Sequence, residues 1–386
     1  MMDERNELFY EDAYLCEFEA AVLSCEESKK GYAVTLDRTA FYPEGGGQPY
    51  DTGYLNDVRV KEVHRKDDAI VHYTDSFLAP GTKVKGKINF DRRFDLMQQH
   101  SGEHVFSGLV HQHFGYDNIG FHLGEKEVVL DFSGPLTHED VLMIEAKTNQ
   151  MIQRNIPVDA FYPSAEELSK LDYRSKKELQ GKVRIVSIED CDVCACCGTH
   201  VRNIGEVGYA KVLSLETKKG NARITVLFGK RASDYMMKIY EEVTAVSALV
   251  SKNPLEIAKG VKHLQDELLD KNLKLNQLYT KQFEQRFEEA QDSHLFITVE
   301  EGCSMDLLRH FCDKMCEKAD IAAGLLKKDK ENFQYVIISK DTDLRPVSKM
   351  LSQEFSGKGG GSKEMIQGSL HGEKDQIITF LRRSFN

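Results

Sequence analysis

Hydrophobic and polar residues alternate along the N-terminal part of the chain with the two-residue period of short strands. The segments 32–43 and 84–90 alternate or are rich in β-formers, and Gly and Asp separate them from their neighbours. Short strands with few helical periods between them are typical of small barrels and sandwiches. The pattern therefore predicts a small β-barrel over residues 1–91.

A helical period replaces the strand period from about residue 92. Apolar residues at helical spacing continue to Gly115, and a second helical pattern covers 138–155. The apolar runs at 128–132 and 223–229 predict strands. We expect a mixed α+β domain over residues 92–245.

A long helix without internal breakers follows. From Pro254 to Gln291 there is no Gly or Pro after Gly260, and apolar residues from Ile257 to Leu278 keep an approximate heptad spacing. Such a helix either packs on its own domain or pairs with a second chain as a coiled coil. The pattern slips at Lys271, which argues against a long regular zipper. We assign residues 246–291 to this helical linker.

The C-terminal segment alternates strand and helix patterns. Expected strands lie at 295–300 and 333–339, and expected helices at 305–319 and 347–355. This alternation predicts a small α/β domain over 292–386. The chain as a whole is predicted to be α+β.

Composition excludes some classes of protein. The net charge is −11, so nucleic acid would have to bind at a local basic patch. No apolar stretch approaches the ~20 residues of a membrane helix. The N-terminus is acidic and has no apolar core segment, so we expect a cytoplasmic protein that does not bind membranes.

Two histidines on the first predicted helix form a candidate metal-binding pair. His100 and His104 are four residues apart, which places both imidazoles on one helical face. Zinc proteases use this spacing with Glu directly after the first His. Here that position is Ser101, and the nearest acid is Glu103, so the pair lacks the general base of a protease. Two solvent-facing histidines would fit the spacing equally well.

A second cluster of metal-binding residue types lies at 191–200. The segment CDVCACCGTH holds four Cys and one His, and zinc prefers thiolate and imidazole ligands. Cys191 and Cys194 could bind a local ion with Cys196 or Cys197. Alternatively, Cys196 and His200 could join the distant histidine pair. Spacing alone leaves both ligand sets open.

Several motifs along the chain resemble one protein family. These are TAFYPEGGGQPYDTG (39–53), QQHSGEHVFSG (98–108), GFHLG (120–124), CCGTHVRNIGEVG (196–208) and RITVLFGKRASDY (223–235). In this order they resemble the AlaX-type alanyl-tRNA editing proteins. The segment FSGKGGGSKEMIQGSL (355–370) is similar to the C-terminal domain of alanyl-tRNA synthetases.

The resemblance implies a ligand set and a reaction. The ligands of one Zn²⁺ would be His100, His104, Cys196 and His200. The reaction would be hydrolysis of the ester that joins Ser, or possibly Gly, to mischarged alanine-specific tRNA. A non-catalytic, zinc-dependent tRNA-binding protein is the alternative. The resemblance leaves Cys191 and Cys194 without a role, and Cys197 stands where relatives often have Gly.

The resemblance also implies positions that contact the substrate and the tRNA. The glycine run Gly45–Gly46–Gly47 would border the amino-acid pocket, with polar contacts from Thr39, Gln48 and His122. The second glycine run would contact tRNA phosphates through Lys358, Gly359, Gly360, Gly361 and Lys363. In relatives this C-terminal domain also dimerises, so a homodimer through the linker and the C-terminal domain is expected.

The two ligand sets predict different outcomes for two variants. If the distant histidine pair binds the ion, His104→Ala and Cys196→Ala will each lower the zinc content of the purified protein, measured by plasma mass spectrometry. Full zinc occupancy in both variants would instead assign the ion to the local cysteine cluster.

Overall fold

The structure is a computed structural model that describes residues 6–175 and 182–385. It divides into two compact units, Met1–Glu242 and Val243–Asn386. Residues 1–5 of the predicted barrel segment lie outside the described residues. The finer division into four parts stays a prediction.

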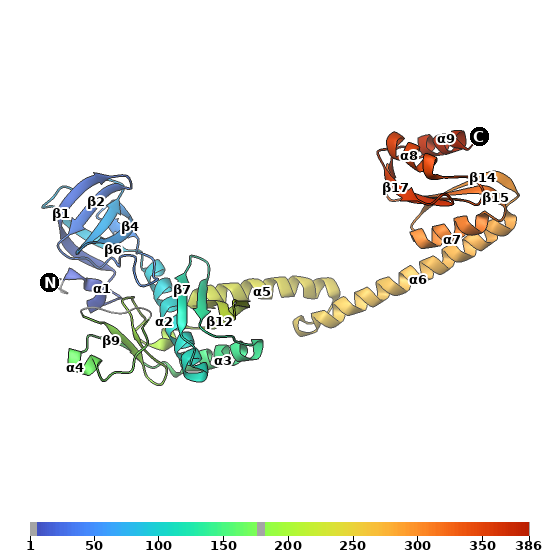
Figure 1. The fold of residues 1–386 in the computed structure, drawn as a ribbon. Coiled ribbons are helices and arrows are strands. Elements are labelled where there is room, and N and C mark those ends of the chain that lie inside the picture. Colours follow the sequence, from blue (N-terminus) through green and yellow to red (C-terminus); the bar gives the residue numbers. More distant parts are fainter. Residues whose placement is uncertain (1–5, 176–181, 386) are drawn as a thin grey trace. The chain divides into compact units, whose positions relative to one another are not determined.

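Six strands near the N-terminus form a closed barrel in the order β1-β2-β5-β4-β3-β6 (Figure 1), which confirms the predicted barrel. A short helix, α1 (Leu8–Glu11), precedes it. The strands are β1 (Glu17–Ser28), β2 (Gly31–Leu36), β3 (Gly53–Leu55), β4 (Val58–Lys66), β5 (Ala69–Thr74) and β6 (Lys83–Ile88).

One strand boundary was predicted wrongly. The strand expected to reach residue 43 ends at Leu36, because the backbone beyond it pairs with the N-terminal segment. Thr39 accepts a hydrogen bond from the Leu8 amide and donates one to the Asn6 carbonyl. The chain from 37 to 52 therefore leaves the barrel.

The helix α2 (Phe90–Phe114) is the centre of the first unit, and it ends at Gly115 as predicted. It packs beside a four-stranded sheet of order β12-β13-β8-β7 and beside a three-stranded sheet of order β11-β10-β9. The other elements are β7 (Asn118–Leu123), β8 (Val128–Phe132), α3 (His138–Arg154), β9 (Val158–Phe161), α4 (Ala165–Leu168), β10 (Ile185–Ile188), β11 (Asp192–Ala195), η2 (Ile204–Val207), β12 (Ala210–Lys218) and β13 (Asn221–Phe228).

Two glycines let α2 approach its neighbours. A Cβ atom at Gly102 would lie 2.3 Å from the Phe228 ring, and one at Gly108 would lie 2.4 Å from the Cys191 carbonyl oxygen. Both distances are far below van der Waals contact, so side chains there would push the helix away. The spacing between α2 and β11 matters because both carry residues of the candidate site.

Sequence patterns missed the helix that follows β13. The strand expected at 223–229 ends at Phe228, and α5 (Gly229–Val250) follows it directly. Gly229 has a positive φ of 59°, and a Cβ there would lie 2.3 Å from the Gln98 side-chain oxygen. The turn from strand to helix therefore needs this glycine.

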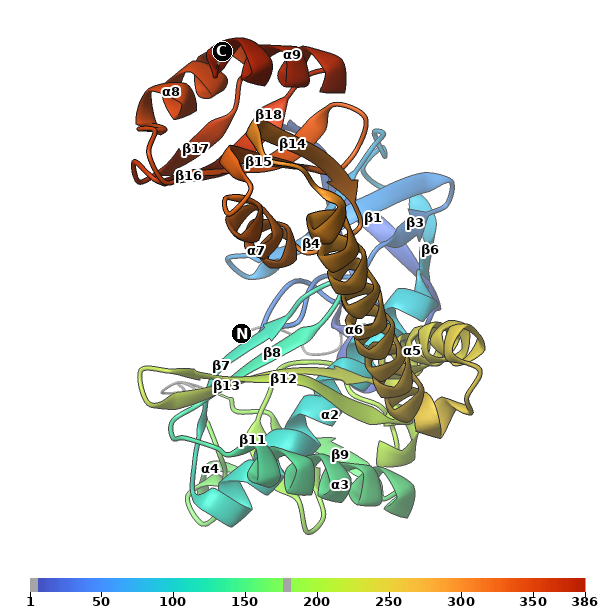
Figure 2. The ribbon, with the colours of Figure 1, turned by 90° about the vertical axis from the view of Figure 1, so that its right-hand side faces the viewer.

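The second unit contains the predicted long helix and the predicted α/β domain. Its sheet has the order β14-β15-β16-β18-β17, with α8 and α9 on one face and α7 on the other (Figures 1 and 2). The elements are η3 (Pro254–Glu256), α6 (Ile257–Glu289), β14 (Ser293–Glu301), α7 (Met305–Met315), β15 (Ala319–Lys327), β16 (Asn332–Ser339), α8 (Arg345–Glu354), β17 (Lys358–Gly361), β18 (Met365–His371) and α9 (Lys374–Ser384).

The glycine run of this unit is a strand and not a turn. Lys358–Gly361 forms β17, an edge strand paired antiparallel with β18. A Cβ at Gly359 would lie 2.2 Å from the Tyr335 hydroxyl oxygen, so glycine permits this close pairing.

Among the described residues, no helix is long and apolar enough to span a membrane.

A buried ion pair joins the barrel, the N-terminal segment and α2. Arg93 and Asp51 are both fully buried, and Asp51 also accepts a hydrogen bond from the Tyr42 amide. The Arg93 guanidinium donates to the carbonyls of Ala13 and Ala40 as well, at 2.8 and 2.7 Å. The Arg93 side chain thus connects three segments of the first unit: the N-terminal segment, the chain that leaves the barrel after β2, and α2.

We predict that Asp51→Ala lowers the free energy of unfolding by about 3–5 kcal/mol, because it leaves a buried guanidinium unpaired. Urea unfolding followed by circular dichroism measures the loss. Glu17→Ala is the matched control, since Glu17 pairs with Lys87 at a site where both side chains are about two-thirds exposed. That variant should change stability by no more than about 1 kcal/mol. Equal effects of the two substitutions would refute the structural role of the buried pair.

Candidate metal centre

Four buried side chains bring their donor atoms together in the first unit. They are His100, His104, Cys196 and His200, and one ligand atom of each lies within 4.8 Å of all the others. The Cys196 Sγ is 3.3 Å from His100 Nε2 and 3.4 Å from His200 Nε2. A tetrahedral zinc ion with ordinary bond lengths separates such N and S donors by about 3.5 Å.

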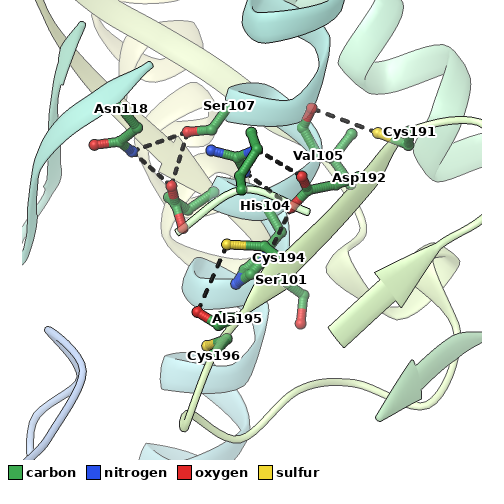
Figure 3. A network of polar contacts seen from close by, with 12 residues as sticks. Ser101, His104, Val105, Ser107, Asn118, Cys191, Asp192, Cys194, Ala195 and Cys196 are labelled. Carbon is green, nitrogen blue, oxygen red and sulfur yellow. Dashed lines mark hydrogen bonds and ion pairs between the residues drawn. The ribbon is translucent and has the colours of Figure 1, made fainter. Parts of the chain in front are cut away.

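Each imidazole is held through its other ring nitrogen. The Nδ1 of His100 lies 2.9 Å from the Gln48 side-chain oxygen. The Nδ1 of His104 lies 2.8 Å from the Asp192 carboxylate (Figure 3), and that of His200 lies 3.1 Å from the Ser101 hydroxyl. Partners on Nδ1 fix the ring and leave Nε2 available to a metal, as in many zinc proteins.

The electrostatics of the cluster favour a thiolate. Burial raises the pKa of the Cys196 thiol, but His100, His200 and His104 outweigh burial, and the pKa falls well below its usual value. The Gly198 amide also donates a hydrogen bond to this sulfur, at 3.3 Å. Burial lowers the pKa of His200 to about 3, so this imidazole stays neutral. A thiolate and a neutral imidazole are the forms that bind zinc.

The negative groups beside His104 favour its protonated form, so a zinc ion that binds there would release this proton. Burial alone would lower the pKa of His104, but Cys196 and Asp192 outweigh it and raise the pKa well above its usual value. Asp192 in turn binds Arg174, with contacts of 2.7 and 2.9 Å. The chemistry, burial and spacing of the four donors therefore fit one zinc ion.

The remaining cysteines of the segment differ from Cys196. Burial raises the pKa of Cys191 to about 12 and that of Cys194 to about 11. Their thiols contact the backbone carbonyls of Val105 and Ala195 (Figure 3). His104, Asp192 and Cys194 also lie close enough to share an ion. Arg174 already forms an ion pair with the Asp192 carboxylate, however. A metal ion at this second position would therefore compete with the Arg174 guanidinium.

The first glycine run forms a tight turn beside the cluster. Gly45 and Gln48 exchange two backbone hydrogen bonds, and Gly46 and Gly47 have positive φ values of 59° and 85°. A Cβ at Gly47 would lie 2.5 Å from the Phe121 ring. The turn therefore needs glycine for both its backbone conformation and its contact with Phe121.

Gln48 is buried, and both polar atoms of its side chain contact protein groups. Its oxygen accepts from the Thr199 amide at 3.1 Å besides facing His100, and its nitrogen donates to the Thr199 hydroxyl at 2.8 Å. A Cβ at the neighbouring Gly198 would lie 2.1 Å from the His100 ring. These contacts hold the His100 ring in place, and a contact between Gln48 and the amino acid stays a prediction.

Two other predicted pocket residues lie away from the cluster. Thr39 is buried and bonds His72 at 2.8 Å. His122 is exposed on β7, while the preceding residue, Phe121, is half-buried and packs 5.2 Å from the His100 ring. Adjacent strand residues point to opposite faces, so Phe121 rather than His122 faces the four donor residues. A contact of His122 with the substrate stays a prediction.

Glu103 is not placed as a general base. Its carboxylate accepts hydrogen bonds from Ser107 at 2.7 Å and from Asn118 at 2.6 Å, which ties α2 to β7.

The predicted tRNA-contacting residues all lie in the second unit. Lys358, Gly359, Gly360, Gly361 and Lys363 are exposed there, on or next to the edge strand β17.

Sequence reasoning missed the partners of the ligands, namely Ser101, Asp192, Gly198 and Phe121. Asp192 stands four residues before Cys196 in the same cysteine-rich segment, and Ser101 directly follows His100. Their proximity along the chain was a usable signal, because a metal-bound His usually donates to a carboxylate or another oxygen acceptor.

Comparisons with known proteins give consistent matches. Residues 183–225 match the family described as threonyl and alanyl tRNA synthetase second additional domain, and residues 3–92 match that described as tRNA synthetases class II (A). The mouse "Alanyl-tRNA editing protein Aarsd1" is 34% identical over 287 residues, which cover 68% of each chain.

Two further relatives bear similar names. The bovine "Alanyl-tRNA editing protein Aarsd1" is 34% identical, and the match covers 68% of this chain but 63% of the relative. "Alanyl-tRNA editing protein AlaX-L" of Pyrococcus horikoshii is 27% identical, and the match covers 96% of both chains. The latter similarity extends through both units.

We predict that Asp192→Asn weakens zinc binding roughly 10–100-fold, because the amide no longer supplies a charge to His104. Competition with a chromogenic chelator measures the affinity. Asp190→Asn is the matched control, since Asp190 is exposed and pairs with Arg154 on the surface. Unchanged affinity in the Asp192 variant would exclude this residue from the support of the metal centre.

Proposed function

The chain belongs to the alanyl-tRNA editing proteins, and from this membership we propose that it hydrolyses the ester of alanine-specific tRNA mischarged with Ser or Gly. The observation that carries the proposal is the meeting of three imidazoles and one thiolate in a buried site. Two of these groups, Cys196 and His200, lie in the segment 183–225 that matches the second additional domain of threonyl and alanyl tRNA synthetases. The non-catalytic, zinc-dependent tRNA-binding protein remains the alternative.

The proposed ligand set is His100, His104, Cys196 and His200. Zn²⁺ held there would supply a Lewis acid for the ester carbonyl or for a water molecule. Four protein donors fill a tetrahedral shell. The protein's part is therefore to hold the ligands in place: Gln48 orients His100, Asp192 and Arg174 orient His104, and Ser101 orients His200.

Selection of Ser over Ala needs a polar group that pairs with the Ser hydroxyl. A site built in this way rejects Ala, because its own polar group would be left without a partner. Thr39 and Gln48 are bound to other protein groups. We therefore propose that the glycine turn at 45–47 contributes through its backbone, which lies beside Phe121 and close to His100.

For the second unit we propose contacts with tRNA and with a second copy of the chain. Lys358 and Lys363 are exposed next to the glycine edge strand and carry charge of the right sign for phosphates. Exposed leucines along α6 would pair two chains; they are Leu264, Leu268, Leu275 and Leu278. We expect this activity in the cytoplasm.

The decisive assay is release of serine from seryl-tRNA specific for alanine, with glycyl- and alanyl-tRNA as parallel substrates. We expect release well above the buffer rate for the seryl ester and little for the alanyl ester. His104→Ala should lower kcat/KM by at least about 100-fold, because loss of a ligand exceeds the 10–100-fold effect of losing a ligand's partner.

The matched control is His113→Ala. His113 lies on the same helix, is exposed, and contacts the Leu109 carbonyl rather than the cluster. This variant should keep full activity. If the protein binds one zinc ion per chain and still releases no serine above buffer, the enzymatic function is wrong and the non-catalytic alternative takes its place.

A further inference from the structure

A cavity of about 480 Å³ adjoins the metal centre within the first unit. Its wall contains Tyr10, Tyr42, Tyr162, Arg65 and Lys182. Ligand pockets for small molecules have volumes of about 300–1,000 Å³. Aromatic faces with a nearby cation are the combination that binds an unstacked nucleobase and its phosphate.

The wall of this cavity is continuous with the metal centre along two segments. Cys197 lines the cavity and directly follows the ligand Cys196. Gly45 also lines it and pairs with Gln48, which contacts His100. The cavity is therefore one residue from the donor Cys196 on one segment, and on the other it is linked to His100 through the Gly45–Gln48 turn.

The aromatic wall is rigidly held. The Tyr10 hydroxyl donates to the Cys197 carbonyl at 2.9 Å, and the Arg184 guanidinium lies 4.9 Å from the Tyr10 ring centroid. Arg184 also donates to the carbonyls of Cys196 and Gly198, at 3.1 and 2.9 Å. The same guanidinium thus braces both the loop of the ligand Cys196 and one face of the cavity.

The second aromatic group is more accessible. Tyr162 follows the end of β9 and keeps 40% of its surface exposed while lining the cavity. Lys182 is exposed at the same wall. Of the two acids in the wall, Glu7 is neutralised by a two-pronged ion pair with Arg65, at 2.8 and 3.0 Å, and Glu44 lies 3.5 Å from His64.

Another cavity near the metal centre has the wrong charge for a nucleotide. It measures about 270 Å³ and reaches Asp192, the partner of His104. Its wall also includes Asp172, Glu189 and Asp190. Its one arginine, Arg174, pairs with Asp192, and Arg154 pairs with Asp190, so Asp172 and Glu189 still leave the wall acidic. This acidic lining would repel a phosphate, so of the two cavities the one with the tyrosines suits the tRNA end.

We propose that the tyrosine-lined cavity binds the terminal nucleoside of the tRNA, with its base against Tyr162 and Tyr10 and its phosphate toward Lys182. This assignment rests on the proposed function, because the aminoacyl ester is attached to the ribose of that nucleoside. Only the ribose separates the base from the ester, so a base-binding cavity must adjoin the reacting group. Binding there would aim the ester at the metal centre.

A binding assay that needs no catalysis tests the cavity. The probe is uncharged alanine-specific tRNA in which 2-aminopurine replaces the terminal adenine. Stacking of 2-aminopurine on an aromatic ring quenches the fluorescence of this base. We expect quenching by the wild type and by Tyr162→Phe, and loss of quenching with Tyr162→Ala. Tyr54→Ala is the matched control, since Tyr54 is 48% exposed on the barrel strand β3 and does not line the cavity.

Hydrolysis of two seryl-tRNAs, one with the terminal base and one with an abasic terminal ribose, gives the second readout. Base stacking on an aromatic side chain contributes about 1–3 kcal/mol, which corresponds to roughly 5–150-fold. Tyr162→Ala should lower kcat/KM by such a factor for the complete tRNA and have no effect on the abasic one. Zinc content should stay unchanged.

The outcomes separate the two proposals. If the wild type quenches 2-aminopurine through Tyr162 but releases no serine, the cavity assignment stands and the editing activity fails. If serine is released while Tyr162→Ala matches the wild type in quenching and in kcat/KM, the terminal base binds elsewhere and the cavity assignment is overturned.

Discussion

Burial of three imidazoles and a thiol at one point is the constraint on which the first unit depends. Such groups cannot be buried together without partners, because each unpaired polar atom costs free energy. Every histidine here has one: Gln48 arrives from the glycine turn, Asp192 from β11, and Ser101 from α2 itself. The donor cluster therefore joins three segments that are far apart in sequence.

Close packing around this cluster explains several glycines. Gly198 lies against the His100 ring, and Gly47 lies against Phe121, which itself packs on His100. Gly102 and Gly108 let α2 lie close enough to β13 and β11 for its histidines to meet the second half of the site. The glycines act through contact distance at these positions, and they set how near the ligands can approach.

Local patterns predicted much of the fold. The barrel, the central helix ending at Gly115 and the long helix α6 follow from periodicity and breakers along the chain. Two errors have non-local causes. The strand expected to reach residue 43 ends at Leu36 because the N-terminal segment takes its place, and the helix α5 begins where a turn at Gly229 packs against Gln98.

The site was less accessible to local reasoning. Spacing alone could not choose between the cysteine cluster and the distant histidine pair. Resemblance chose, and the structure brings the chosen four donors together. His100 and His104 meet their partners Gln48 and Asp192 across 52 and 88 positions, so the pairing lies outside any local pattern even where a partner stands near another donor in the sequence. For the same reason no local pattern predicts that Gln48 faces His100.

We propose that one zinc ion is bound by three nitrogens and one sulfur. X-ray absorption at the zinc edge of the metal-loaded, full-length protein measures this first coordination shell directly. The account predicts one sulfur at about 2.3 Å, with nitrogen donors at about 2.0–2.1 Å. A shell with two or more sulfurs would contradict it and assign the ion to the cysteine cluster at 191–197.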